Sequence, residues 1–188
     1  FTMGDVKWSD VKKTAQAEVG YKEGPDNWTK YAAELDAINY FNGSKQNVAW
    51  CATFTSWCFY KSASPDPKGT ALAAQYQPSK DNCGCGVKFN ANYYKNKNKF
   101  VSSPKPGDVF FTSNYTHTGF VSEVYSDGTF RTIEGNHDDM VANVIRKVSD
   151  MAGFGRPWYT AESDPDKQVD ITIKVNAPEG VKVNIKVE

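Results

Sequence analysis

One cysteine in this chain stands where a nucleophile would be expected. Cys51 would open a helix over residues 51–62, which carries few charges and has apolar residues on more than one side. Such a helix belongs in the interior of a protein. The unpaired N–H groups and the positive dipole end at a helix start stabilise an anion, and the thiolate is the reactive form of cysteine. Taken alone, Cys51 is more simply a small buried apolar residue, so the case depends on a base elsewhere.

A predicted β-hairpin carries a candidate base, His117. Asp127-Gly128 favours a two-residue type I′ turn between strands over residues 117–125 and 129–136. In the register set by that turn, Gly119 lies opposite Asn136. Side chains two residues apart on a strand, and those directly opposed across a pair, point to the same face.

His117, Glu134 and Asn136 are therefore expected on one face of the hairpin. A carboxylate or amide beside an imidazole fixes its tautomer and its orientation, as a general base requires. A slip of one residue would turn Glu134 and Asn136 to the other face. Together with Cys51, these residues form a candidate catalytic set.

The alternatives to this set are weaker. His137 could serve as the base, but strict alternation along the strand places it on the opposite face. Asp138 and Asp139 are interpreted as solvated loop residues, and no loop has the ligand spacing of a calcium site. Four cysteines and two histidines lack the spacing of a structural zinc site, and free thiols are favoured over a disulfide from Cys58 to Cys83 or Cys85. We expect no metal and no cofactor.

The other elements follow from periodicity and from helix boundary signals. Trp8-Ser9-Asp10 predicts the start of a first helix that Gly20 ends, and Asn27 the cap of a second helix with Trp28 on its buried side. From residue 104 onward the apolar residues follow a strand period. Helices followed by an antiparallel sheet predict an α+β domain. Short helices are expected within residues 70–75 and 89–94, and strands within residues 109–111, 117–125, 129–136, 141–148 and 153–159.

Composition argues against two classes of partner. The 188 residues include 22 Lys and Arg and 22 Asp and Glu without a long run of one sign, so no nucleic-acid footprint is predicted. No segment is apolar for long enough to span a membrane. The high aromatic content is typical of extracellular proteins that contact carbohydrate or cell wall. The first residues do not read as a signal peptide, so localisation has to follow from function.

The chain divides into a domain, a linker and an appendage. Residues 1–160 form the predicted catalytic domain, and residues 161–168 a polar linker. Residues 169–188 alternate apolar and polar side chains around a turn, which predicts a β-hairpin with one apolar face. Two strands alone are marginally stable in water. The apolar face is therefore expected to pack against the catalytic domain, a second copy of the chain or a further module.

Four motifs in this order resemble those of the CHAP family, the cysteine, histidine-dependent amidohydrolases and peptidases of the papain-like, NlpC/P60-related type. The resemblance extends over about residues 19 to 159 and implies a papain-like fold with helices packed on a small antiparallel sheet. It also implies Cys51 as nucleophile, His117 as base, and Glu134 and Asn136 as orienting residues. The motifs are Trp50-Cys51-Ala52 with Ser56-Trp57-Cys58, Pro106-Gly107-Asp108-Val109-Phe110-Phe111, His117-Thr118-Gly119-Phe120-Val121 and Ile133-Glu134-Gly135-Asn136.

One position departs from the family pattern. Trp50 stands where many members have Gln, so an oxyanion hole would need the Cys51 N–H and some other donor. Trp50 and Tyr115 flank the candidate residues, and they either line a substrate cleft or serve ordinary packing. The acidic motif of the calcium-binding members is not found upstream of Cys51.

The resemblance implies hydrolysis of amide bonds in bacterial peptidoglycan. The target would be the stem peptide, the cross-bridge or the bond that joins muramic acid to L-alanine. The site of action would be outside the cell, at the wall, for a protein of bacterial or phage origin. Two alternatives stay open, which are a non-catalytic wall-binding module and the same catalytic site directed at a protein.

Overall fold

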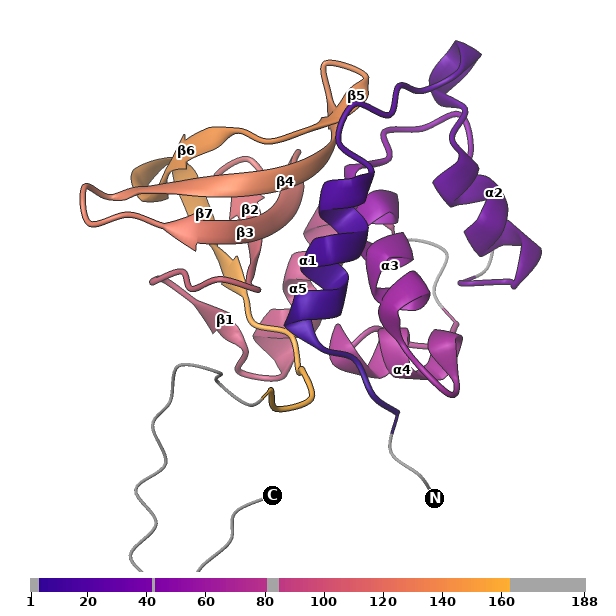
Figure 1. Ribbon diagram of the computed structural model, residues 1–188, viewed down its shortest axis with the longest axis horizontal. Helices are drawn as coiled ribbons and strands as arrows, with labels where there is room; N and C mark the ends of the chain where they lie inside the picture. Colours follow the sequence, from indigo (N-terminus) through magenta and orange to yellow (C-terminus); the bar gives the residue numbers. More distant parts are fainter. Residues whose placement is uncertain (1–3, 42, 81–84, 163–188) are drawn as a thin grey trace, which may run out of the picture.

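The computed structural model describes residues 4–41, 43–80 and 85–162. The predicted hairpin over residues 169–188 and most of the predicted linker lie outside the described residues. Figure 1 shows the helices gathered on one side of a strongly curved sheet. The helices come mainly from the first half of the chain and the strands from the second, which confirms the α+β class.

The described residues contain five α-helices and two short 3-10 helices. The central helix, α3, begins at Cys51 and ends at Ser62, as the sequence predicts. The elements are α1 (Trp8–Ala17), η1 (Pro25–Asn27), α2 (Lys30–Ala37), α3 (Cys51–Ser62), α4 (Pro67–Ala74), α5 (Val87–Asn96) and η2 (Val148–Asp150).

The strands of the described residues form one antiparallel sheet. Its order is β1-β7-β2-β3-β4-β5, and β6 pairs with β4 as well. This order brings the last strand of the domain, β7, between the first two. The strands are β1 (Phe100–Val101), β2 (Val109–Thr112), β3 (Thr118–Val124), β4 (Thr129–His137), β5 (Met140–Ala142), β6 (Ile145–Lys147) and β7 (Met151–Gly155).

Helix α3 is the centre of the fold. Every residue from Cys51 to Phe59 is buried, and the helix contacts α1, α2, α4, α5, β3 and β4. The ring of Tyr31 in α2 lies 5.1 Å from that of Phe54 and 4.7 Å from that of Trp57, measured between centroids. A helix that is apolar on nearly all sides is stable only when other elements cover it in this way.

The start of α2 differs from the prediction. Thr29, not Asn27, is the N-cap, and its side-chain oxygen accepts a hydrogen bond from the Ala32 N–H at 3.1 Å. Asn27 instead has a left-handed backbone with φ 58°. As a result Trp28, expected on the buried side, is 47% exposed.

The loop of the β3–β4 hairpin is one residue longer than predicted. Ser126, Asp127 and Gly128 form a three-residue loop, and the Tyr125 N–H donates to the Thr129 carbonyl at 3.0 Å. Gly128 takes the positive φ, 82°, that follows a type I turn in such loops. The longer loop moves the strand pairing by one residue from the predicted register.

A β-bulge between Val121 and Glu123 moves the pairing by a second residue. Phe120 therefore pairs with Ile133, and a Cβ on Gly119 would lie 3.2 Å from the Glu134 Cα. Since two shifts of one residue restore the alternation of side chains, Glu134 still faces the same side as His117.

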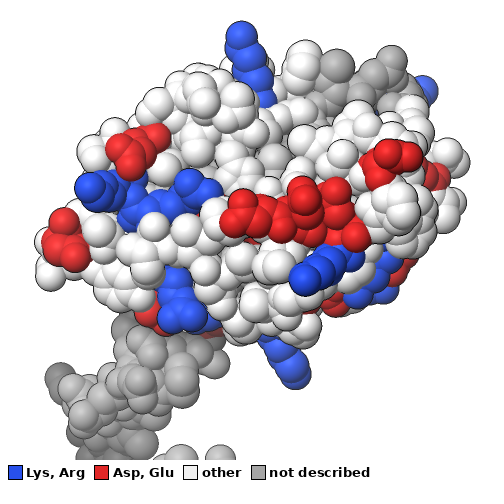
Figure 2. Space-filling view, turned by 90° about the horizontal axis from the view of Figure 1, so that it is seen from above, with Lys and Arg blue, Asp and Glu red and all other residues white. Residues whose placement is uncertain are grey.

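None of the helices in the described ranges has the length and apolar character to cross a bilayer. Figure 2 shows one face of the molecule, on which acidic side chains form a continuous group near the middle and basic side chains are scattered around it. The face carries both signs of charge, as the balanced composition leads one to expect.

Candidate active site

Cys51 is the first residue of α3, and its side chain is almost fully buried, with 2% of its surface exposed. The preceding residue, Trp50, is the N-cap, and its carbonyl accepts from the Phe54 N–H at 2.9 Å. The N–H groups of the first helical turn are left without carbonyl partners inside the helix. The sulfur therefore lies at the positive end of the buried helix, where the sequence predicted it.

His117 lies at the end of the turn that joins β2 to β3. Its backbone N–H donates to the Thr112 Oγ1 at 3.1 Å, and its carbonyl accepts from the Thr112 N–H at 3.2 Å. These two bonds fix the backbone from which the imidazole projects. The ring lies close enough to Cys51 for that residue to affect its pKa, and its Nε2 is hydrogen-bonded to the Glu134 Oε2 at 2.6 Å. Since Nε2 faces Glu134, Nδ1 is the nitrogen left for the sulfur.

Glu134 is fully buried in β4 and is held by three side chains. Arg146 in β6 binds both carboxylate oxygens, with Nε 2.5 Å from Oε1 and Nη2 2.7 Å from Oε2. The Thr132 hydroxyl donates to Oε1 at 2.6 Å. Burial alone would raise the pKa of Glu134, but the hydrogen bonds from Arg146, His117 and Thr132 outweigh it and lower this pKa to about 2. The carboxylate is thus ionised at neutral pH.

The pKa of His117 is shifted in the opposite direction. Burial disfavours the charged ring, but the hydrogen bonds and charges of Cys51 and Glu134 outweigh this effect and raise the pKa to about 9. The imidazolium is therefore the main form at neutral pH.

Sequence reasoning missed Arg146. It lies within the predicted strand over residues 141–148, but nothing in the local pattern assigned it a partner. It reaches Glu134 because β6 pairs with β4, with Phe130 aligned on Arg146. The guanidinium also lies over the Phe110 ring, 5.1 Å from its centroid. The available signal was an arginine in a predicted strand and an acidic residue in another. To pair the two, one has to know that β6 pairs with β4, and the sequence alone did not show this pairing.

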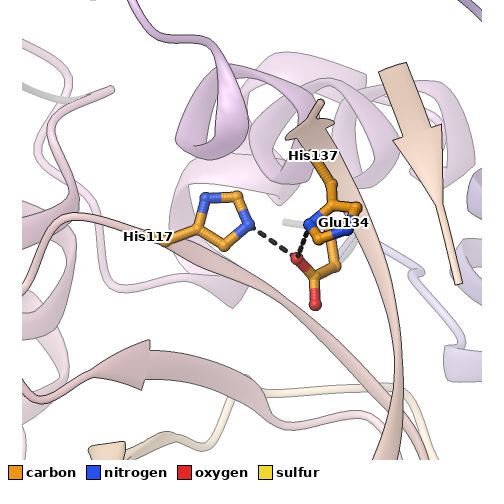
Figure 3. A group of neighbouring side chains, drawn as sticks. All are labelled: His117, Glu134 and His137. Atoms are coloured by element: carbon orange, nitrogen blue, oxygen red, sulfur yellow. Dashed lines mark hydrogen bonds and ion pairs between the residues drawn. The ribbon is translucent and has the colours of Figure 1, made fainter. Parts of the chain in front are cut away.

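The prediction that His137 points away from Glu134 is wrong. Figure 3 shows both imidazoles directed at one carboxylate, with the His137 Nδ1 3.7 Å from the Glu134 Oε2. The cause is the backbone of Asn136, whose left-handed φ of 57° interrupts the alternation of the strand. The pairing of β4 with β5 is irregular over the same residues.

The same irregularity affects the interpretation of Asn136. The residue is half-buried and next to His137, at the end of β4. Its predicted position was derived from regular alternation, which does not hold at this residue. The His117 Nε2 is hydrogen-bonded to Glu134. An orienting role for Asn136 stays a prediction.

The two aromatic candidates for substrate binding are placed differently. Trp50 is fully buried, and its indole N–H donates to the Glu23 Oε2 at 2.6 Å, so the prediction that it lines a substrate cleft is wrong. It packs instead among Tyr21, Tyr31 and Phe54. Tyr115 is half-buried on the turn before His117, and its hydroxyl accepts from the Lys95 Nζ at 2.6 Å.

The other described cysteines have different surroundings from Cys51. Cys51, Cys58 and Cys85 are free thiols, as predicted, and Cys83 lies outside the described residues. Burial raises the pKa of Cys58 and raises that of Cys85 to about 11, so both stay protonated at neutral pH. A protonated thiol is a poor nucleophile.

One known sequence family matches the part of the chain that contains this site. The CHAP domain family matches residues 39–136, a range that includes Cys51, His117 and Glu134. The chain belongs to the CHAP domain family, a class of hydrolase domains of the peptidoglycan amidase and peptidase type. No match was found among curated proteins or among solved structures.

Proposed function

We propose that this protein is a cysteine hydrolase that cleaves amide bonds in bacterial peptidoglycan, with Cys51 as nucleophile and His117 as acid and base. One observation carries the proposal. The sulfur at the start of α3 lies close enough to the His117 imidazole to affect its pKa, and the Nε2 of that ring lies 2.6 Å from a fully buried carboxylate. A nucleophile, a base and a residue that orients the base are the parts that covalent hydrolysis requires.

The first half of the reaction forms an acyl-enzyme. The Cys51 thiolate attacks the carbonyl carbon, and the carbonyl oxygen becomes an oxyanion. The Cys51 backbone N–H at the helix start is the donor placed to stabilise it. The protonated His117 then gives its proton to the leaving amine as the carbon–nitrogen bond breaks. The Trp50 indole N–H is engaged by Glu23, so it supplies no donor to the oxyanion.

The second half releases the acyl group. His117, now neutral, takes a proton from water, and the hydroxide attacks the thioester carbonyl. Collapse of that intermediate expels the Cys51 thiolate and leaves the imidazolium, so both groups return to their starting charge. Glu134 holds the ring in one orientation throughout, and Arg146 keeps Glu134 in place and ionised.

The class of substrate follows from the family, and the family resemblance leaves three bonds open. These are bonds in the stem peptide, bonds in the cross-bridge, and the amide between muramic acid and L-alanine. The proposed site of action is the cell wall, outside the cell. Tyr115, on the turn next to His117, is the aromatic side chain proposed to contact the substrate.

The test is to incubate the protein with purified cell walls and with defined muropeptides, and to identify the fragments by mass. We expect new amine termini from the wild-type protein and none from Cys51→Ala. Cys85→Ser is the matched control, because it removes a thiol that is protonated at neutral pH and has no part in the proposed reaction, so the fragments should be unchanged. Full activity of Cys51→Ala would overturn the proposal.

The same experiment separates the alternatives. Retention on insoluble wall without any fragment would identify a non-catalytic wall-binding module. Cleavage of protein with no action on walls or muropeptides would keep the catalytic site but change its substrate. The masses of the fragments identify which of the three bonds is cut.

A further inference from the structure

Three side chains at the candidate site lie close together, and the proposed hydrolysis uses only two of them. His117, Glu134 and His137 each offer a ligand atom, and these atoms all lie within 4.8 Å of one another. Figure 3 shows the two rings directed at the same carboxylate. Two imidazoles and one carboxylate are a donor set that binds Zn²⁺ in proteins, with a fourth position left open. The proposed reaction employs His117 and Glu134 and gives His137 no part.

The distances suit a small ion with modest movement. Zinc bonds of about 2.0–2.2 Å in tetrahedral geometry place neighbouring ligand atoms roughly 3.3 Å apart. The Glu134 Oε2 lies 3.7 Å from the His137 Nδ1 and 2.6 Å from the His117 Nε2. An ion therefore requires the first pair to close by a few tenths of an ångström and the second to open by less than 1 Å. The two imidazole nitrogens lie within 4.8 Å of each other, so they have to approach by up to about 1.5 Å.

The surroundings allow an ion to reach the site from solvent. The side chain of His137 is 35% exposed and that of His117 is 18% exposed, so an ion can reach both from solvent. The His137 Nε2 lies 3.7 Å from the Oδ2 of the exposed Asp138, which is too long for a hydrogen bond. The Asp138 carboxylate would have to come closer to support the outer nitrogen of a ligating His137.

Arg146 limits where an ion can bind. Its Nη2 lies 2.7 Å from the Glu134 Oε2, the same oxygen that faces both imidazoles. An ion at Oε2 can therefore replace the proton between Glu134 and His117 but not the guanidinium. The positive charge of Arg146 lowers the affinity of the site, which suits reversible binding.

We propose that His117, Glu134 and His137 form a binding site for Zn²⁺ or a similar divalent transition-metal ion, and that the bound ion blocks hydrolysis. The binding is independent of the proposed function, whereas the block rests on it. In a neutral imidazole one nitrogen carries a proton and the other accepts. An ion on Nε2 leaves the proton on Nδ1, so the ring cannot take a proton on the side of Cys51.

The binding is tested in Cys51→Ala, which removes the thiolate and keeps the three ligands. Calorimetric titration with ZnCl₂ should give one site per chain, and Co²⁺ should give the visible absorption of a tetrahedral complex. Adding His137→Gln should weaken Zn²⁺ binding by about tenfold or more, since even outer-shell changes cost about 10–100-fold. Adding Cys85→Ser instead should leave the affinity unchanged. Equal affinity with and without His137 would overturn the proposed site.

The block is tested with otherwise wild-type protein on a defined muropeptide. Zn²⁺ should inhibit, a chelator should restore activity, and Mg²⁺ at the same concentration should have no effect because it prefers oxygen ligands. The concentration of Zn²⁺ for half inhibition should rise about tenfold or more in His137→Gln, measured against the metal-free rate of that variant. An unchanged concentration would overturn the block. Activity of Cys51→Ala would contradict the hydrolase proposal while the titration still decides the metal site.

Discussion

At the scale of single residues, the site depends on one buried charge. Glu134 has no exposed surface, and it is ionised because the hydrogen bonds from Arg146, His117 and Thr132 outweigh the effect of its burial. The carboxylate in turn raises the pKa of His117 and orients its ring. Arg146 is therefore a positioning residue that acts on the reaction through two others.

The pH dependence of hydrolysis should reflect the proton on His117. Because its pKa is raised to about 9, kcat/KM on a muropeptide should fall as the pH rises through about 9, when the acid for the leaving amine is lost. The groups that set this pKa are Cys51 and Glu134. In Glu134→Gln the fall should move to lower pH, since a group that raises the pKa is gone. A fall at the same pH in both proteins would contradict the assignment.

The sequence predicted the three central residues because each has a local signal. Cys51 opens a run of apolar residues, and His117 and Glu134 lie on strands joined by a clear turn. Arg146 was missed because its position depends on the pairing of β6 with β4, and His137 was placed on the wrong face because of the left-handed Asn136. The sequence left Trp50 open between a substrate cleft and ordinary packing because its partner Glu23 lies 27 residues away.

At the scale of elements, the site requires α3, which carries Cys51, to lie close to β4, which carries Glu134. Gly135, the residue after Glu134, makes this approach possible. A Cβ at this position would lie 2.5 Å from the Phe54 Cβ and 2.8 Å from the Trp50 Cζ3. The helix and the strand are therefore in contact at the residues that adjoin the nucleophile and the carboxylate.

Gly135→Ala should lower the stability and the activity together. The added methyl group would force α3 and β4 apart, and overpacking of this kind costs about 1–3 kcal/mol. Thermal unfolding and kcat/KM on a muropeptide measure the two effects. Gly24→Ala is the control, because its Cβ would have its nearest contact at 3.4 Å, an ordinary distance. Equal behaviour of the two variants would show that the approach of α3 and β4 is not tight.

The order of the elements was predictable and their ends were less so. The change from helical to strand period after residue 104 is visible in the sequence. The cap of α2 was placed two residues early because Asn27 and Thr29 are both good caps, and only the fold selects Thr29. The β-bulge near Val121 has no local signal, because it results from the pairing with β4.

At the scale of the whole molecule, the last strand, β7, joins the edge strand β1 to the rest of the sheet. β7 pairs with both β1 and β2, and Arg156, just after β7, binds the buried Asp108. The Arg156 Nε lies 3.0 Å from Oδ1, and Nη2 lies 2.9 Å from Oδ2. This ion pair joins the residue after β7 to the residue before β2. It is not part of the proposed site.

Arg156→Met should lower the stability of the domain without changing the chemistry. The substitution would leave the Asp108 carboxylate buried without its cation, at a cost of about 2 kcal/mol. The free energy of unfolding in urea measures this loss, while kcat at low temperature should be unchanged. Lys61→Met, which breaks the exposed pair with Glu34, is the control and should change stability by less than about 1 kcal/mol. A lower kcat in Arg156→Met would show that the pair also shapes the site.

The central claim is that Cys51, His117 and Glu134 act as one unit, and a double-mutant cycle tests it most directly. The measurement is kcat/KM on a defined muropeptide for wild type, Glu134→Gln, His117→Ala and the double variant. Glu134→Gln should cost about 10²–10⁴-fold alone, because the base loses its orientation. In the absence of His117 the same substitution should cost less than about twofold, since residues of one unit are not additive. An equal loss in both backgrounds would contradict the account.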